Sequence, residues 1–198
     1  MAAITLTTCQ GRDIAPHLEA LARLRIRVFR DFPYLYDGDP AYEADYLDRY
    51  ARNPRSLFVL AFDGGPLVGA ATGQPLADEV DEFRGPFEAA GYRPETVFYY
   101  GESVLLPEYR GRGIGKAFME ARETHAAGEG FEFAAFCAVE RPDDHPRKPA
   151  DYRPLHGFWN ARGYRRTPSL VTTFAWKDQD EAEETAKPMV FWLKALRP

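Results

Sequence analysis

Pro107-Glu108-Tyr109-Arg110-Gly111-Arg112-Gly113-Ile114-Gly115-Lys116 is the most informative stretch of this sequence. An apolar run with aromatic residues, residues 97–106, precedes it and is typical of a central strand. Residues with high helix propensity follow it and continue to the glycines at positions 128 and 130. The stretch is therefore expected to be a turn that links a strand to a helix.

Three alternate glycines in this turn require a physical reason, because glycine at a helix start costs up to ~1 kcal/mol relative to alanine. The first amides of a helix have no intrahelical partner and lie at the positive end of the helix dipole. Without β-carbons in the way, these amides can close around a phosphate. Arg110, Arg112 and Lys116 add positive charges at the same place. The pattern predicts a turn that binds a pyrophosphate.

Two common phosphate-binding loops are excluded by the spacing. A Walker A loop requires Ser or Thr directly after its lysine, whereas Ala117 follows Lys116. A Rossmann fingerprint requires Gly-x-Gly-x-x-Gly near the start of a βαβ unit, whereas this turn reads Gly-x-Gly-x-Gly after half of the chain. A glycine-rich turn without a ligand remains the alternative at this point.

The segments before the turn predict a strand, two helices and a hairpin. Residues 3–7 alternate weakly, as in a first strand, and apolar residues recur at helical spacing over 18–28. A short helix is expected through residues 42–50. Residues 57–62 and 67–73 are apolar runs that flank Asp-Gly, a strong hairpin signal.

The segments on either side of the central strand and its helix complete the order. Residues 78–94 and 141–154 are expected to be loops, because they are rich in charged residues, glycine or proline. The elements expected after the turn are a strand, a short helix and two final strands, at residues 131–139, 155–162, 170–176 and 189–196. This order predicts an α/β fold whose sheet is antiparallel in its first half and flanked by helices.

Composition limits the class of protein. A chain of 198 residues with 45% apolar and 28% charged residues suits one globular domain, residues 1–198. No apolar run approaches the roughly 20 residues of a membrane span, and the start lacks signal-peptide features, so a cytoplasmic location is expected. Cys9 and Cys137 lie far apart and outside any Cys/His pattern, so no disulfide or metal site is predicted. The net charge of −5 disfavours a nucleic-acid partner. No membrane partner is expected, and whether the chain forms a homodimer stays open.

The turn and its neighbours resemble the GNAT (Gcn5-related) N-acetyltransferase superfamily, whose signature is Arg or Gln, two residues, Gly, one residue, and Gly or Ala. Arg110, Gly113 and Gly115 match this signature. Residues 104–109 resemble the family's bulged fourth strand and its turn, and residues 158–164 resemble its Phe-Tyr-x-x-x-Gly-Phe helix ending. The resemblance is clear from about residue 57 to residue 164. It implies a GNAT-type acyl-CoA N-acyltransferase fold, with a mixed sheet of about six to seven strands flanked by about four helices.

The resemblance also implies a co-substrate, acetyl-CoA, and its contacts. In the family, the strand before the turn and the strand after the helix splay apart and hold the pantetheine arm of CoA. Ser103, Val104 and Leu105 are the residues implied to contact that arm. The residues implied to bind the rest of acetyl-CoA are Arg110, Gly111, Arg112, Gly113, Ile114, Gly115 and Lys116 at the pyrophosphate, with Arg153 and Trp159. The implied reaction moves the acetyl group to a primary amine of a small-molecule or peptide acceptor, without a metal.

Acyl transfer to an amine requires a group that takes the amine's proton. Glu102 is the only carboxylate inside the predicted central strand, and alternation places it on one face with Phe98, Tyr100 and Val104. An unpaired charge is costly on such an apolar face, so Glu102 is either a general base or the ion-pair partner of an arginine. Family members often carry this carboxylate one residue earlier, at Gly101 here, which leaves the assignment open.

The group that protonates the leaving thiolate is less defined. The tyrosine that often has this role in the family is replaced by Trp159, whose indole cannot supply a proton. His156 lies one helical turn before Trp159 on the same face and is the first substitute, and Tyr152 is the second. Arg153 stands where the family frequently has asparagine. The missing tyrosine keeps open an alternative function, a non-catalytic acyl-CoA sensor or scaffold of the same fold.

Overall fold

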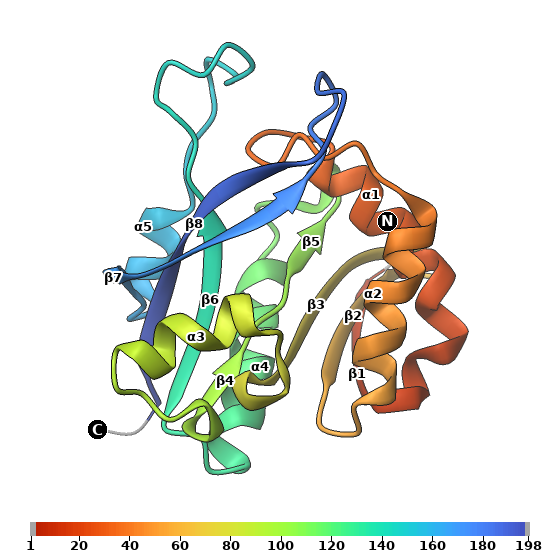
Figure 1. Ribbon diagram of the computed structural model, residues 1–198. Coiled ribbons are helices and arrows are strands. Elements are labelled where there is room, and N and C mark those ends of the chain that lie inside the picture. The colour runs from red at the N-terminus through yellow and green to blue at the C-terminus, as the bar shows by residue number, and fades with distance from the viewer. Residues whose placement is uncertain (1–2, 197–198) are drawn as a thin grey trace.

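The computed structural model describes residues 3–196, which form one mixed sheet with helices on both of its faces (Figure 1). The sheet has eight strands in the order β1-β2-β3-β4-β6-β8-β7, and β5 pairs with β3 beside β4. The strands are β1 (Ile4–Gln10), β2 (Leu57–Asp63), β3 (Leu67–Pro75), β4 (Val97–Tyr99), β5 (Ser103–Leu105), β6 (Phe133–Val139), β7 (Arg165–Trp176) and β8 (Thr185–Ala195). Paired strands are antiparallel except β4 and β6, which are parallel.

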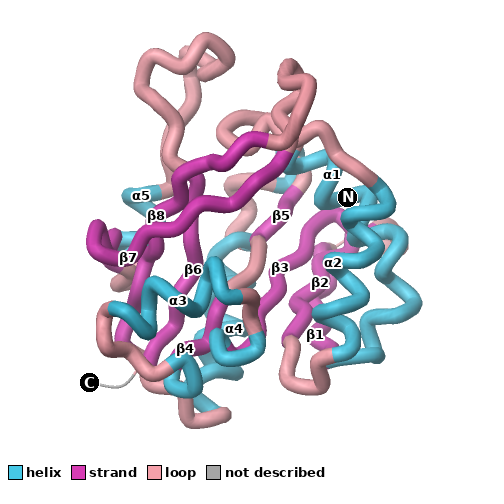
Figure 2. Tube along the Cα trace, viewed as in Figure 1, coloured by secondary structure: helices cyan, strands magenta, loops and turns pink. Residues whose placement is uncertain are grey.

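Five α-helices connect these strands within the described residues. They are α1 (Leu18–Phe29), α2 (Pro40–Arg52), α3 (Asp81–Ala89), α4 (Ile114–Gly128) and α5 (His156–Ala161). Short 3-10 helices are η1 (Gly11–His17), η2 (Leu76–Asp78), η3 (Pro94–Thr96) and η4 (Pro107–Tyr109). α1, α2 and α3 cover one face of the sheet, and α4 and α5 cover the other (Figures 1 and 2). None of the helices described is both long enough and apolar enough to cross a membrane.

The core fills both faces because side chains alternate along the central strands. In β2, Leu57 and Val59 pack in the cluster that contains α4, whereas Phe58 and Leu60 pack against α1 and α2. A strand that is apolar at every position is typical of a sheet covered on both sides. The continuous apolar run at residues 57–62 therefore reflects a central position in the sheet.

The α/β fold, the antiparallel first half and the hairpin predicted from the sequence are confirmed. At the tip of the β2–β3 hairpin, the N–H of Asp63 donates to the carbonyl oxygen of Pro66 (3.1 Å). Gly64 adopts a φ of +71° there, which explains the Asp-Gly pair at this turn. The helices expected over 18–28 and 42–50 correspond to α1 and α2.

The expected loop at residues 78–94 is wrong in part, because it contains α3. Gly85 and Pro86 disfavour a helix by propensity, but Phe83 and Phe87 lie four residues apart and share one face. Phe87 is fully buried, with its ring centroid 4.9 Å from that of Phe191. Tertiary packing therefore overrides propensity here.

The predicted central strand, residues 97–106, is divided into β4 and β5 by residues 100–102, which accounts for the extra strand in the sheet. β4 pairs with both β3 and β6, whereas β5 pairs with β3. The N–H of Tyr100 still donates to the carbonyl oxygen of Ala135 (2.8 Å). Beyond Tyr100, β5 and β6 diverge, as the resemblance implied (Figure 2).

The division also corrects the face assigned to Glu102. Phe98 and Tyr100 pack in the cluster that contains α4, but Val104 packs against α1 and α2. Glu102 contacts side chains of α1 and α2 and thus shares its face with Val104 only. Strict alternation fails because the extra residue of a bulge reverses the faces that follow. A β-carbon on Gly101 would lie 2.4 Å from the Tyr50 hydroxyl oxygen, so the bulge requires glycine at this position.

Candidate functional site

The opening between β5 and β6 is the centre of the candidate site. The N–H of Thr72 donates to the carbonyl oxygen of Glu102, and the N–H of Leu106 donates to that of Val68 (both 3.0 Å). Residues 102, 104 and 106 therefore direct their backbone groups toward β3. The intervening residues, Ser103 and Leu105, direct their N–H and C=O groups toward the opening.

The three strand residues predicted to contact a ligand thus differ in what they can offer. Ser103 is exposed and Leu105 is half-buried. Val104 is fully buried, and its register partner in β3 is Ala70. Its side chain serves the core, so only Ser103 and Leu105 remain suited to bind a ligand in the opening.

The glycine turn at the end of β5 has the predicted backbone conformation. Gly111 and Gly113 have φ values of +76° and +82°, and Gly113 is the N-cap of α4. The N–H of Ala117 makes an intrahelical bond to the carbonyl oxygen of Gly113 (3.0 Å), which leaves the amides of Ile114, Gly115 and Lys116 ahead of it. β-carbons placed on the three glycines would meet no atom within 4 Å in the described chain. Open space therefore surrounds a row of helix-start amides.

Three cations surround this turn at its surface. Arg110 Nε lies 3.4 Å from the carbonyl oxygen of Leu105, and Arg112 Nη2 donates to that of Glu108 (2.9 Å). Lys116 Nζ lies 3.6 Å from Glu120, and both side chains are more than half exposed. Such exposed contacts contribute little and can be exchanged for a phosphate. Ile114, by contrast, is buried in the core, so only its amide faces the turn.

Glu102 lies on the opposite side of the bulge in a buried polar cluster. Its Oε2 atom lies 2.6 Å from Arg25 Nη1 and accepts a hydrogen bond from the Tyr46 hydroxyl (2.8 Å). Arg25 also pairs through Nε with Glu43. Burial acts to lower the pKa of Arg25, but Glu102, Tyr46 and Glu43 together raise it well above its usual value. Arg25 therefore stays charged, and the ion pair that was one alternative for Glu102 is present.

A pocket opens beside this cluster. Its remaining lining is mostly aromatic: Phe29, Tyr34, Tyr36, Tyr42, Phe83, Tyr99, Phe174 and Trp176, with Gly101, Cys137 and Met189. Glu102 Oε1 and Glu43 Oε1 are buried and make no hydrogen bond to any residue that the structure describes. Because buried carboxylate oxygens are costly without a partner, the pocket is suited to a donor group.

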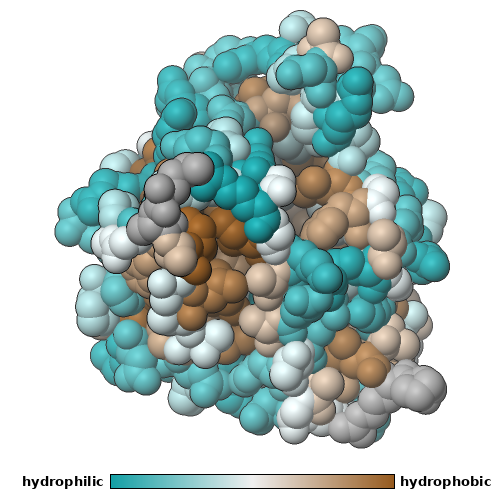
Figure 3. Space-filling view, turned by 180° about the vertical axis from the view of Figure 1, so that it is seen from behind, coloured by the Kyte–Doolittle hydropathy of each residue, from teal (hydrophilic) through white to brown (hydrophobic). Residues whose placement is uncertain are grey.

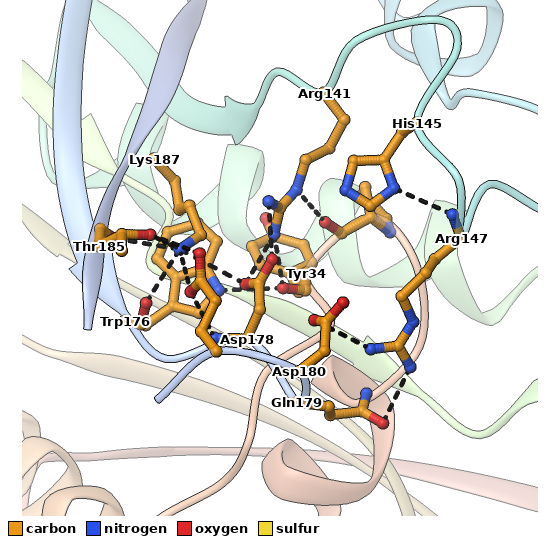
Figure 4. Close-up of polar contacts among 12 residues, drawn as sticks. Tyr34, Arg141, His145, Arg147, Trp176, Asp178, Gln179, Asp180, Thr185 and Lys187 are labelled. Carbon is orange, nitrogen blue, oxygen red and sulfur yellow. Dashed lines mark hydrogen bonds and ion pairs between the residues drawn. The ribbon is translucent and has the colours of Figure 1, made fainter. Parts of the chain in front are cut away.

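Ion pairs hold the rim of this pocket together, as Figure 4 shows. Arg141 donates to the carbonyl oxygens of Pro33 (2.8 Å) and Tyr34 (2.9 Å) and pairs with Asp178 (2.9 Å). The Trp176 indole N–H also donates to the carbonyl oxygen of Tyr34 (2.9 Å). Three segments far apart in the sequence are thus fixed to one another, which holds the Tyr34 and Trp176 walls in place.

The structure brings His156 and Trp159 together, as their spacing predicted. Their ring centroids lie 5.7 Å apart, and both rings pack near Trp192. His156 is exposed, and so are Leu155 and Phe158 beside it. Apolar areas are visible on this rear face of the molecule (Figure 3). α5 therefore presents an apolar surface with one imidazole on the face that carries α4.

Tyr152 lies elsewhere, in the loop after β6. Its ring meets Phe32 edge to face, with centroids 4.7 Å apart, and burial raises its pKa. Arg153 is exposed and donates from Nη1 to the carbonyl oxygen of Tyr152 (3.1 Å). The structure shows no hydrogen bond from Tyr152 or His156 to Glu102 among the described residues.

Sequence reasoning missed Arg25, Glu43 and Tyr46, which make the cluster around Glu102, and Arg122, which is buried behind the bulge. A signal was present: Arg25 lies one turn after Leu21 on the apolar stripe of α1. A charged residue on a buried stripe requires a partner, so its position marks a polar cluster. No group of three or more His, Cys, Asp or Glu in the described chain is arranged to hold a metal.

Comparisons with known proteins agree with this geometry. No curated protein matches the chain significantly in sequence. The fold is similar to an N-acetyltransferase from Staphylococcus aureus (13% identity, TM-score 0.64, covering 99% of this chain and 100% of that one). It is also similar to NAA60 of Arabidopsis thaliana, solved with a bisubstrate analogue (14% identity, TM-score 0.64, covering 98% of this chain and 100% of that one). A third structure of similar fold is YncA of Salmonella typhimurium, solved with its cofactor acetyl-CoA (12% identity, TM-score 0.60, covering 100% of this chain and 96% of that one).

A family model settles the classification, since it matches residues 19–167 and thus most of the chain. The matched region contains the diverging strands, the open glycine turn and the cluster around Glu102. This chain belongs to the GNAT family of acetyltransferases.

Proposed function

We propose that this protein is an acetyl-CoA-dependent N-acyltransferase, which moves an acetyl group to a primary amine of a small-molecule or peptide acceptor. One observation carries the proposal: β5 connects two different compartments, one at each of its ends. The first is the turn of open amides and exposed cations at the end of β5. The second is the aromatic pocket that contains Glu102. An anionic co-substrate and a cationic acceptor each have a complementary place.

The turn suits the pyrophosphate of CoA. Amides of residues 114–116 donate without intrahelical competition, and Arg110, Arg112 and Lys116 supply charge. Ser103 and Leu105 offer backbone groups at alternate positions to the amides of the pantetheine arm. In this arrangement the thioester lies near the bulge, between the two compartments.

The reaction forms a bond between the amine nitrogen and the acetyl carbon and breaks the carbon–sulfur bond. Glu102 takes the proton that the ammonium must lose, directly or through a water. A backbone N–H of Ser103 donates toward the oxyanion that develops on the thioester carbonyl. The departing sulfur receives a proton from Tyr152, from His156 or from solvent.

The direct test measures acetyl-CoA binding by calorimetry and the release of CoA thiol with a panel of primary amines. Binding together with amine-dependent release, and an acetylated product of the expected mass, supports the proposal. Binding without release for every amine supports the alternative, an acyl-CoA sensor or scaffold, which the replacement of the usual tyrosine by Trp159 favours. Absence of binding contradicts both.

A further inference from the structure

We infer that the acceptor is an amine with a single positive charge and an apolar or aromatic body, bound in the pocket beside Glu102. The inference rests on the proposed function and names its substrate class. Two independent properties of the pocket carry it: the charge of its polar cluster and the character of its walls.

The charge of the cluster matches one ammonium group. Glu43 and Glu102 carry two negative charges, and Arg25 carries one positive charge. The three side chains are nearly inaccessible, with 0%, 2% and 7% exposed respectively. Among the residues that line the pocket, two carboxylates therefore face one cation in a poorly solvated place, and this arrangement favours a further cation.

Unused hydrogen-bond acceptors are present at the same place. Glu102 Oε1 and Glu43 Oε1 are both without a hydrogen-bond partner among residues 3–196. The pKa of Glu43 is raised, because the effect of burial outweighs that of Arg25, which lowers it. An ammonium donates to such oxygens, whereas a hydroxyl group of the same size brings no charge.

The walls leave no partner for a second charge. Apart from Arg25, Glu43 and Glu102, the described lining residues are aromatic, sulfur-containing or glycine. The rings of Phe83 and Phe174 stack with centroids 5.5 Å apart. Trp176 lies beside Tyr34, with ring centroids 5.9 Å apart. Such surfaces bind apolar groups and contribute cation–π attraction for one ammonium.

Ion pairs hold the rim in place. Arg141 and Lys187 both pair with Asp178 (Figure 4), and Lys187 also pairs with Glu181. Because the rim fixes the aromatic walls before binding, less ordering is required when an apolar acceptor enters.

The experiment compares 2-phenylethylamine, ethylamine and spermidine in the thiol-release assay. Burial of the phenyl group should raise kcat/KM for 2-phenylethylamine roughly 10–100-fold above ethylamine. Spermidine, which adds charges without a ring, should lie at or below ethylamine. Transfer to all three with spermidine preferred, or without preference for the ring, overturns the inference while the proposed function stands.

If no amine is acetylated, calorimetry measures the binding of the same probes to the acetyl-CoA complex or to the free protein. 2-Phenylethylamine should bind at least about tenfold more tightly than 2-phenylethanol, which has the same body without the charge. Equal binding of the two, or tighter binding of spermidine, contradicts the inference. Failure of acetyl transfer alone contradicts only the proposed function.

A matched pair of variants locates the effect in the pocket. Phe174→Ala removes a partly exposed ring from the lining, and Val171→Ala truncates a 52%-exposed side chain of the same strand outside it. Phe174→Ala should lower the ratio of kcat/KM between 2-phenylethylamine and ethylamine at least about fivefold. Val171→Ala should leave that ratio unchanged. An unchanged ratio in Phe174→Ala would place the aromatic acceptor elsewhere.

Discussion

Arg122 Nη1 donates a hydrogen bond to the backbone carbonyl oxygen of Glu102 at 3.0 Å, from the opposite face of the sheet. The same atom lies 3.1 Å from the carbonyl oxygen of Thr72, and Nη2 donates to Ser103 Oγ (2.7 Å). Arg122 is only 1% exposed, and burial lowers its pKa. Its guanidinium stacks over Tyr100 at 4.2 Å. A buried cation thus donates to the Thr72 carbonyl oxygen, and it is a second donor to the Glu102 carbonyl oxygen, which also accepts from the Thr72 N–H.

Arg122→Met is expected to lower the free energy of unfolding by roughly 2–4 kcal/mol, because it removes the buried hydrogen bonds to the carbonyl oxygens of Thr72 and Glu102 and to Ser103 Oγ. Methionine has similar length and good helix propensity, so α4 itself should tolerate it. Denaturant unfolding measures the change. Arg23→Met is the control, since Arg23 is 67% exposed and, among residues 3–196, pairs only with Glu19, and its effect should stay below about 1 kcal/mol. Equal stability of both variants would show that the bulge does not depend on Arg122.

The order of elements could be predicted because the signals are local. Asp63-Gly64 defines a hairpin, and the glycines between a strand and a helix define the turn before α4. The α3 helix and the full length of β7 and β8 depend on packing between distant segments, such as Phe87 on Phe191. Propensity does not contain that information.

The glycine turn of the candidate site could be predicted from the sequence, but the surroundings of Glu102 could not. The glycine turn is a contiguous segment, so its conformation followed from the residue types. The environment of Glu102 depends on Arg25 and Tyr46, which come from two helices far away in the sequence. The bulge at Gly101 also reversed the face of Glu102, and no alternation pattern reveals a bulge in advance.

Gly115→Val tests the turn without straining the backbone. Gly115 has no positive φ, and a β-carbon there would meet no described atom within 4 Å. The free protein should therefore keep its stability, but the added side chain should fill space needed by a phosphate and weaken acetyl-CoA binding more than tenfold by calorimetry. Gly128→Val, at the other end of α4 and equally open, is the control and should bind normally. Normal binding by both variants would contradict the proposed turn.

Cys137 is expected to react slowly with alkylating agents. Burial raises the pKa of its thiol to about 12, and Tyr99 Oη lies 3.0 Å from the sulfur. In a Cys9→Ser variant, alkylation at pH 8 should be roughly 10³-fold slower than that of free cysteine, whose pKa is about 8.5. Below its pKa the thiolate fraction increases tenfold per pH unit, so the rate should keep rising through pH 10. A plateau near pH 9 would contradict an apolar pocket wall.

Tyr152→Phe is expected to lower kcat by roughly 10-fold or more if the phenol protonates the leaving sulfur. Burial raises the pKa of Tyr152, so this donor keeps its proton throughout the neutral range and the rate should not fall between pH 6 and 8. His156→Gln is the matched variant. A larger loss of kcat in His156→Gln than in Tyr152→Phe would assign the role to His156 instead. Unchanged kcat in both variants would leave protonation to solvent.

Glu102→Gln is expected to lower kcat roughly 10²–10⁴-fold at neutral pH, because it keeps the shape of the side chain and removes the carboxylate that takes the ammonium proton. Acetyl-CoA affinity should change little, since the turn at residues 110–116 is separate from this cluster. Glu102→Gln also removes an ion pair with Arg25, so Glu43→Gln is the control. Glu43→Gln removes a carboxylate partner from the same arginine and keeps the proposed base. That variant should raise KM and change kcat less than about tenfold. Equal losses of kcat in the two variants, or a Glu102→Gln protein that unfolds while its activity per folded molecule is intact, would make Glu102 a structural partner of Arg25.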